Sequence, residues 1–130
     1  MHHVAVPIDW TVDHEKRLIE ATANGMVSAQ EMRKYLDDVA RTGGMPYAKI
    51  FDLADATTDL SIADVQMIGR SIRQYAIDGF GPLGPLAIVV GNGRGQFHAA
   101  GFADSAGTTR PLRIFKDRDA AFAWFRSLGR

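Results

Sequence analysis

The hydrophobic residues of this chain follow two periods, one typical of strands and one typical of helices. Short apolar or alternating runs predict five strands, at Val4–Ile8, Arg17–Ala23, Ala48–Leu53, Leu86–Val90 and Leu112–Phe115. The polar stretch Asp9–Asp13 is predicted to be a turn, so the first two strands are expected to form an antiparallel hairpin. Pro7 favours a place for the first strand at a sheet edge.

Apolar side chains spaced three and four residues apart predict helices between the later strands. Three of the predicted helices start at capping residues, and two end at glycines. The four predicted helices run from Ser28, paired with Glu31 in a capping box, to Gly43-Gly44; from Ser61, with Asp64 in the glutamate position, to Gly79; over Gln96–Asp104; and from a cap at Asp117 or Asp119 to about Leu128.

The expected order of elements is therefore β-β-α-β-α-β-α-β-α. Asn24-Gly25 is expected to end the second strand, and Ala54–Leu60 is expected to be a polar linker. Strands separated by helices imply right-handed parallel crossovers, with the opening hairpin adding an antiparallel edge. The fold class is α/β, with a mixed, mostly parallel sheet.

Length and composition are those of a small globular domain. The chain has 130 residues, of which 46% are hydrophobic, and its 15 basic residues balance its 15 acidic ones. Such a chain is long enough to bury a core without a disulfide or a structural metal. We therefore expect one domain over residues 1–130.

The charge balance and the residue types present disfavour several classes of function. A nucleic-acid partner is not expected, because there is no basic excess to neutralise phosphates. The chain has no cysteine, which fits a reducing compartment, and no run long enough to span a bilayer. We expect a cytoplasmic protein without stable membrane insertion. No metal or cofactor is expected, since none of the four histidines, including His98, has a partner at metal-ligand spacing.

The segment Gly91-Asn92-Gly93-Arg94-Gly95, between a buried strand and a predicted helix, is the most suggestive motif. Backbone N–H groups at a helix start can hold an anion, and Arg94 would add positive charge. The spacing matches neither a dinucleotide fingerprint nor a phosphate-binding P-loop. A tight turn and a small-ligand site both remain open.

Other polar residues offer weaker chemistry. No nucleophile elbow surrounds Ser61, and Asp52, Asp55 and Asp59 lack the glycine and glutamate of a calcium loop, so we interpret them as a hydrated acidic loop. Four large aromatic residues could complete the core or form a homodimer patch: Trp10, Phe80, Phe97 and Phe102.

The ordered motifs resemble the SpoIIAA-like proteins of the STAS (sulfate transporter and anti-sigma factor antagonist) group, including those described as STAS/SEC14-like. The resemblance runs from about Val4 to Leu128. It is carried by the segments Ala23–Glu31, Ile50–Leu53, Ala87–Val90 and, most specifically, Arg113–Phe125, in which a strand ending in phenylalanine precedes aspartate, alanine and tryptophan on a helix.

The resemblance implies a single α/β domain with helices mainly on one face of the sheet. It also implies a non-enzymatic regulatory module, in which a serine at the start of the helix after the third strand is phosphorylated. The corresponding residue is Ser61. The antagonists' Asp-Ser-Gly signature is absent, since Ile62 follows Ser61, so a plain N-cap remains the alternative to a phosphorylation site.

We therefore expect a binding module for a protein partner or a small ligand. Its surface is expected to join two loops that follow parallel strands, with site residues Thr57, Thr58, Ser61, Gly91, Asn92, Gly93 and Arg94. A small lipid or apolar-ligand carrier of the SEC14-like type is the alternative. An enzyme would need a titrating side chain in a cleft beside Ser61 or His98.

Overall fold

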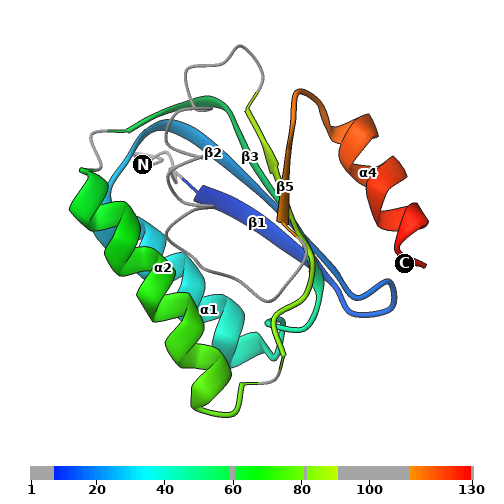
Figure 1. Ribbon diagram of the computed structural model, residues 1–130. Coiled ribbons are helices and arrows are strands. Elements are labelled where there is room, and N and C mark those ends of the chain that lie inside the picture. The colour runs from blue at the N-terminus through cyan, green and yellow to red at the C-terminus, as the bar shows by residue number, and fades with distance from the viewer. Residues whose placement is uncertain (1–7, 59–60, 81, 91–111, 130) are drawn as a thin grey trace, which may run out of the picture.

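The structure is a computed structural model that describes residues 8–58, 61–80, 82–90 and 112–129. These residues form five strands and three helices (Figure 1). In chain order they are β1 (Ile8–Asp13), β2 (Leu18–Val27), α1 (Ala29–Thr42), β3 (Ala48–Thr58), α2 (Ile62–Ile77), β4 (Leu86–Val89), β5 (Leu112–Phe115) and α4 (Arg118–Ser127).

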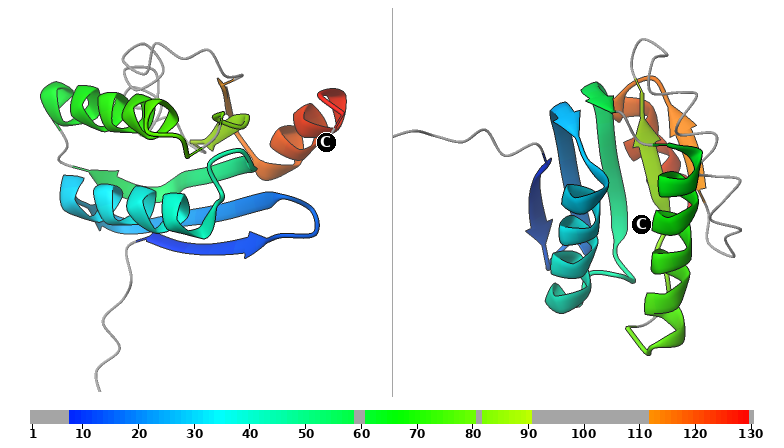
Figure 2. Two further views of the ribbon diagram at one scale, coloured as in Figure 1. Left: turned by 90° about the horizontal axis from the view of Figure 1, so that it is seen from below. Right: turned by 90° about the vertical axis from the view of Figure 1, so that its left-hand side faces the viewer.

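The strands form one sheet in the order β1-β2-β3-β4-β5. β1 is antiparallel to β2, and every other neighbouring pair is parallel. Helices α1 and α2 lie side by side on one face of the sheet, and α4 lies on the other (Figure 2). The predicted mixed, mostly parallel sheet is confirmed. The predicted helix Gln96–Asp104 lies outside the described residues.

The prediction for the first strand was wrong in its position. Asp9–Asp13, predicted to be a turn, belongs to β1, and the turn follows at residues 14–17. Trp10 and Val12 point to the face covered by α1 and α2, so the polar residues that alternate with them occupy the opposite face. The residues alternate as in a strand with one buried face, and this alternation outweighs the polar composition. The expected edge position is confirmed.

The second and third strands are longer than predicted. Asn24-Gly25 does not end β2, because a register irregularity between Thr22 and Asn24 lets pairing with β3 continue to Val27. Gly25 supplies the positive φ of 66° that this stretch requires. The matching part of β3, residues 54–58, was predicted to be a linker. Its pairing with β2 overrides the turn-forming character of its Asp and Thr residues.

The predicted N-cap residues are confirmed, although the Glu31 carboxylate meets the Ser28 hydroxyl and does not complete the predicted capping box. The Ser28 hydroxyl accepts from the Glu31 backbone N–H at 3.2 Å and donates to the Glu31 carboxylate at 3.1 Å. Gly43 closes α1 in the left-handed conformation, with φ of 80°. Asp117 rather than Asp119 caps α4, accepting from the Ala120 N–H at 2.9 Å.

The alternation of side chains along the strands divides the core into two layers. Between the sheet and helices α1 and α2 lie Ile19 of β2, Val39 of α1 and Ile72 of α2, all buried. On the other face, Ala121 and Phe125 of α4 pack on a smaller apolar patch made by Ala48, Ile50, Ala87 and Val89. Among the described residues, no helix is both long and apolar enough to cross a membrane.

A buried lysine joins the turn before β3 to the turn before β4. Lys49 of β3 is 5% exposed, and its Nζ donates to the backbone carbonyls of Met45 and Tyr47. The Met45 carbonyl also accepts from the Gly84 N–H at 2.9 Å, while the Lys49 N–H donates to Pro85 O at 2.9 Å. The two turns are therefore held together by charge-assisted and backbone hydrogen bonds.

We predict that Gly84→Ala destabilises the protein through this junction. A Cβ at Gly84 would lie 2.2 Å from Tyr47 O and 2.3 Å from Pro46 O, both backbone atoms that cannot rotate away. Urea unfolding should show a loss of about 2–3 kcal/mol in the free energy of unfolding. Gly25→Ala is the control, because its Cβ meets no atom within 4 Å and costs only left-handed strain of about 1 kcal/mol. Equal losses for both variants would contradict the prediction.

Candidate functional site

Ser61 lies at the exposed start of α2 and takes part in a complete capping box. Its hydroxyl accepts from the Asp64 N–H at 3.1 Å, and the Asp64 carboxylate accepts from the Ser61 N–H at 3.1 Å. The predicted capping role of Ser61 is therefore confirmed. The same hydroxyl remains on the surface.

The other predicted site residues are placed only in part. Thr57 and Thr58 are the last residues of β3, paired with Met26 and Val27 of β2. Gly91, Asn92, Gly93 and Arg94 lie outside the described residues, so whether the two loops share a surface stays a prediction.

The strand register shows that β3 and β4 end at different positions along the sheet. Val89, the last residue of β4, pairs with Asp52, whereas β3 continues for six more residues to Thr58. At the rise of an extended strand, those residues carry β3 about 20 Å further along the sheet. The hydrophobic pattern does not indicate this difference, because it predicts a linker at the polar end of β3.

Exposed methionines accompany Ser61 at this end of the sheet. Met67, on α2 six residues after Ser61, is 39% exposed, and Met26, at the end of β2, is 56% exposed. The Arg33 guanidinium of α1 lies 3.9 Å from the Met67 sulfur, which joins the two helices at their surface.

A second polar group was missed at the sequence level. Arg118, the first residue of α4, spreads its guanidinium over the sheet face opposite α1 and α2. Its Nε donates to Asp52 at 2.9 Å, one terminal nitrogen donates to Glu20 at 3.2 Å, and the other donates to the Thr22 hydroxyl. All three guanidinium nitrogens therefore have a protein partner.

The signal for this group was present in the β2 pattern. Leu18, Glu20 and Thr22 alternate with buried residues, so they share one face, and in a parallel pair Asp52 lies beside Thr22. The interpretation of Asp52 and Asp55 as part of a hydrated loop is wrong, because both belong to β3; only Asp52 fell within the strand predicted at Ala48–Leu53. What the pattern did not contain was the cation, since Arg118 is separated from Asp52 by 66 residues.

The remaining titratable contacts lie elsewhere. Burial raises the pKa of the Tyr75 hydroxyl on α2, Asp37 of α1 raises it further and Arg41 lowers it. This tyrosine therefore belongs to the contact between the two helices. At the hairpin, His14 Nδ1 lies 2.8 Å from the Tyr47 hydroxyl. No group of three or more His, Asp or Glu side chains suited to a metal ion occurs in the part of the chain that the structure describes.

The comparisons with known proteins bear on the fold. No family model matches the chain, and neither does any curated protein sequence. A solved structure is similar: the 2.25 Å crystal structure of an uncharacterized protein of the DUF3478 family from Shewanella loihica PV-4, described as having a SpoIIAA-like fold. The TM-score is 0.60, and the match covers 95% of this chain and 98% of that one. This chain has a SpoIIAA-like fold.

The sequence identity to the Shewanella protein is 11%, so the likeness concerns the fold alone. Within the SpoIIAA-like fold, this chain's own residues define two surfaces. One is the start of α2 with Ser61 and Met67, and the other is the sheet face on which Arg118 is seated.

We predict that Arg118→Met lowers the free energy of unfolding by about 1–2 kcal/mol, because it leaves the partly buried Asp52 and the nearby Glu20 without their cation. Arg118→Lys should lose less, since it keeps the charge but not the three directed hydrogen bonds. Arg126→Met, an exposed position at the other end of α4, is the control and should change stability by less than about 0.5 kcal/mol. Chemical denaturation measures all three, and a wild-type stability for Arg118→Met would refute the prediction.

Proposed function

We propose that this protein is a non-enzymatic interaction module that binds a protein partner through the surface at the start of α2. The observation that carries the proposal is the exposure of Met67 on α2, six residues after the solvent-facing Ser61 cap. Methionine is flexible and polarizable, so an exposed one can adapt to an apolar partner surface. The absence of cysteine supports a cytoplasmic setting for this module.

The second part of the proposal is that charge at Ser61 controls this surface. A phosphate there would meet the free N–H groups at the helix start, which favour an anion. It would also meet the Asp64 carboxylate, which already occupies the Ser61 N–H. Phosphorylation would therefore break the capping box and add negative charge where the partner is expected to dock.

The binding surface is tested by charge reversal on one helix. Met67→Glu should reduce capture of the partner from a cell extract of the source by at least about tenfold, because a charged group would be placed in an apolar contact. Ile77→Glu is the matched control: Ile77 is 75% exposed at the far end of the same helix and should leave capture unchanged. Quantitative mass spectrometry of the captured proteins gives the readout. Equal effects of both variants would exclude this surface.

The role of charge at Ser61 is tested by two substitutions that both cap a helix. Ser61→Asn keeps an N-cap without charge and should retain capture and thermal stability. Ser61→Asp keeps the cap but adds a carboxylate, and it should weaken capture by about tenfold. The same capture assay compares them. If the two variants bind equally, charge at Ser61 does not regulate the module.

A further inference from the structure

The outer side of β1 is an unused sheet edge. Within the described residues, β1 pairs with β2 on one side and with no strand on the other. An edge strand presents unpaired backbone N–H and C=O groups, which form a template for another strand. β1 supplies six residues for such pairing, Ile8 to Asp13.

The two faces of β1 differ in chemistry. Trp10 and Val12 face the core under α1, and Trp10 is only partly buried, with its ring 5.9 Å from that of Tyr35 in an edge-to-face contact. Asp9 and Asp13 face the other way. A strand added here would therefore need apolar side chains on one face and side chains compatible with carboxylates on the other.

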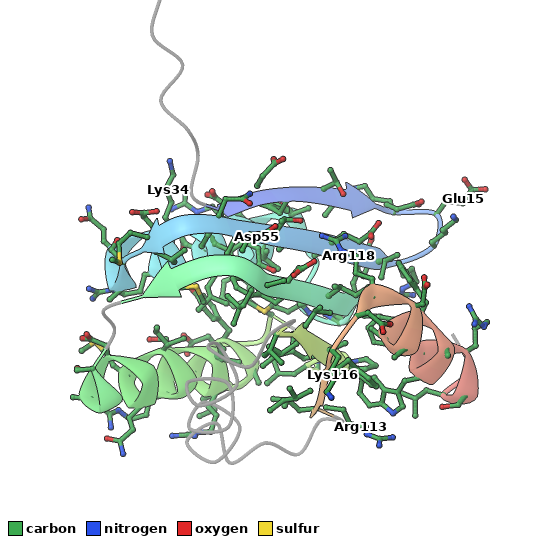
Figure 3. The ribbon with its side chains drawn as sticks, turned by 90° about the horizontal axis from the view of Figure 1, so that it is seen from above. Glu15, Lys34, Asp55, Arg113, Lys116 and Arg118 are labelled. Atoms are coloured by element: carbon green, nitrogen blue, oxygen red, sulfur yellow. The ribbon has the colours of Figure 1, made fainter. Side chains whose placement is uncertain are left out.

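The carboxylates of β1 belong to a larger acidic face. Thr22 and Glu20 of β2 lie opposite Asp9 and Thr11. Asp52 and Asp55 extend the face onto β3, and Figure 3 shows Asp55 on it, with Arg118 nearer to α4. Five carboxylates thus lie on this side of strands β1 to β3, with the Arg118 guanidinium seated among them: Asp9, Asp13, Glu20, Asp52 and Asp55. Arg113 lies on the same side of the sheet, but on β5 at the opposite edge.

Arg118 shows what kind of group this face accommodates. Its guanidinium is held by two carboxylates and a hydroxyl of the sheet, so a cation on this face finds directed hydrogen bonds as well as opposite charge. Arg118 reaches β2 and β3 only. The carboxylates nearer the edge, Asp9 and Asp13, form no ion pair with any described side chain.

A second copy of this chain is a poor occupant of the edge. Two copies of β1 could pair antiparallel with Trp10 of both on the helix side. Asp9 and Asp13 of both copies would then lie on the opposite face, directly across from one another or one side-chain row apart. Like charges in such rows destabilise strand pairing. Pairing between the β1 strands of two copies is therefore disfavoured, whereas a basic strand is attracted to the same edge.

We propose that β1 docks an extended basic segment of another protein, which adds a sixth strand to the sheet and places lysine or arginine side chains against Asp9 and Asp13. The backbone ladder supplies the attachment, and the alternation of basic and apolar residues supplies the selectivity. This site is separate from the surface at the start of α2 and does not rest on the function proposed for it.

The probe is a fluorescein-labelled heptapeptide that alternates lysine with valine, starting and ending on lysine. Fluorescence anisotropy should detect its binding to the wild-type protein, and the analogue with glutamate in place of lysine should not bind. Asp9→Asn combined with Asp13→Asn should weaken binding at least fivefold. Asn keeps the acceptor that Asp13 offers to the Lys16 N–H. The control pair, Asp38→Asn on α1 with Asp78→Asn at the C-cap of α2, should change it less than twofold.

Strand addition is separated from simple charge attraction by methylating the peptide backbone. Two versions carry N-methyl groups on alternate residues, one at odd and one at even positions, so only one version blocks the N–H groups that face β1. That version alone should lose binding. If both bind like the parent peptide, if the control pair weakens binding as much as the β1 pair, or if the parent fails to bind at about 1 mM, the proposal is overturned.

The same assay distinguishes this site from the surface at the start of α2. Met67→Glu should leave peptide binding unchanged, and the β1 double variant should leave capture through the α2 surface unchanged. Each proposal can therefore fail without the other.

Discussion

The packing of this molecule depends on a buried ammonium group that donates hydrogen bonds to backbone carbonyls. Lys49 enters the core from β3 and ties the carbonyls of Met45 and Tyr47 to the strand that follows them. Removing an amine from water is costly unless strong acceptors replace the water. The turn must therefore keep the shape that presents those carbonyls, and Gly84 can approach the same turn only because it lacks a side chain. This junction fixes the spacing of β3 and β4, on which both core layers are built.

Helices cover one face of the sheet more completely than the other. The well-covered face forms most of the core, whereas the partly covered face leaves charged side chains exposed. Under α1 and α2 the strands contribute almost continuous apolar side chains, and this layer contains most of the large buried residues. On the other side α4 covers the β3–β5 half, and Arg118 marks the border between the apolar patch and the acidic one. One arginine thus both anchors a helix and neutralises part of the exposed face.

The sequence predicted five strands in their correct order and placed the described helix starts accurately, because capping serines, aspartates and glycines act locally. It misplaced β1 and shortened β2 and β3, because those boundaries are set by pairing between strands. Residues 54–58 form a strand since β2 lies beside them, and Gly25 permits rather than ends that pairing. Arg118 could not be assigned from the sequence, since its partner Glu20 lies 98 residues away. The capping role of Ser61 was predicted, whereas Met67 was not singled out, because it lies outside the apolar stripe of the amphipathic helix α2.

The long β2–β3 pairing has a mechanical consequence. Beyond Thr22 and Asp52 the two strands continue as a two-stranded ribbon, to which neither β1 nor β4 is paired at its far end. One strand of this ribbon leads into α1 through Ser28, and the other leads into α2 through Ser61. Any force that displaces the start of one helix must bend the ribbon, and the shared ladder transmits that bend to the start of the other. The two helix starts are therefore mechanically coupled, and a displacement at Ser61 is transmitted through the ribbon to Ser28.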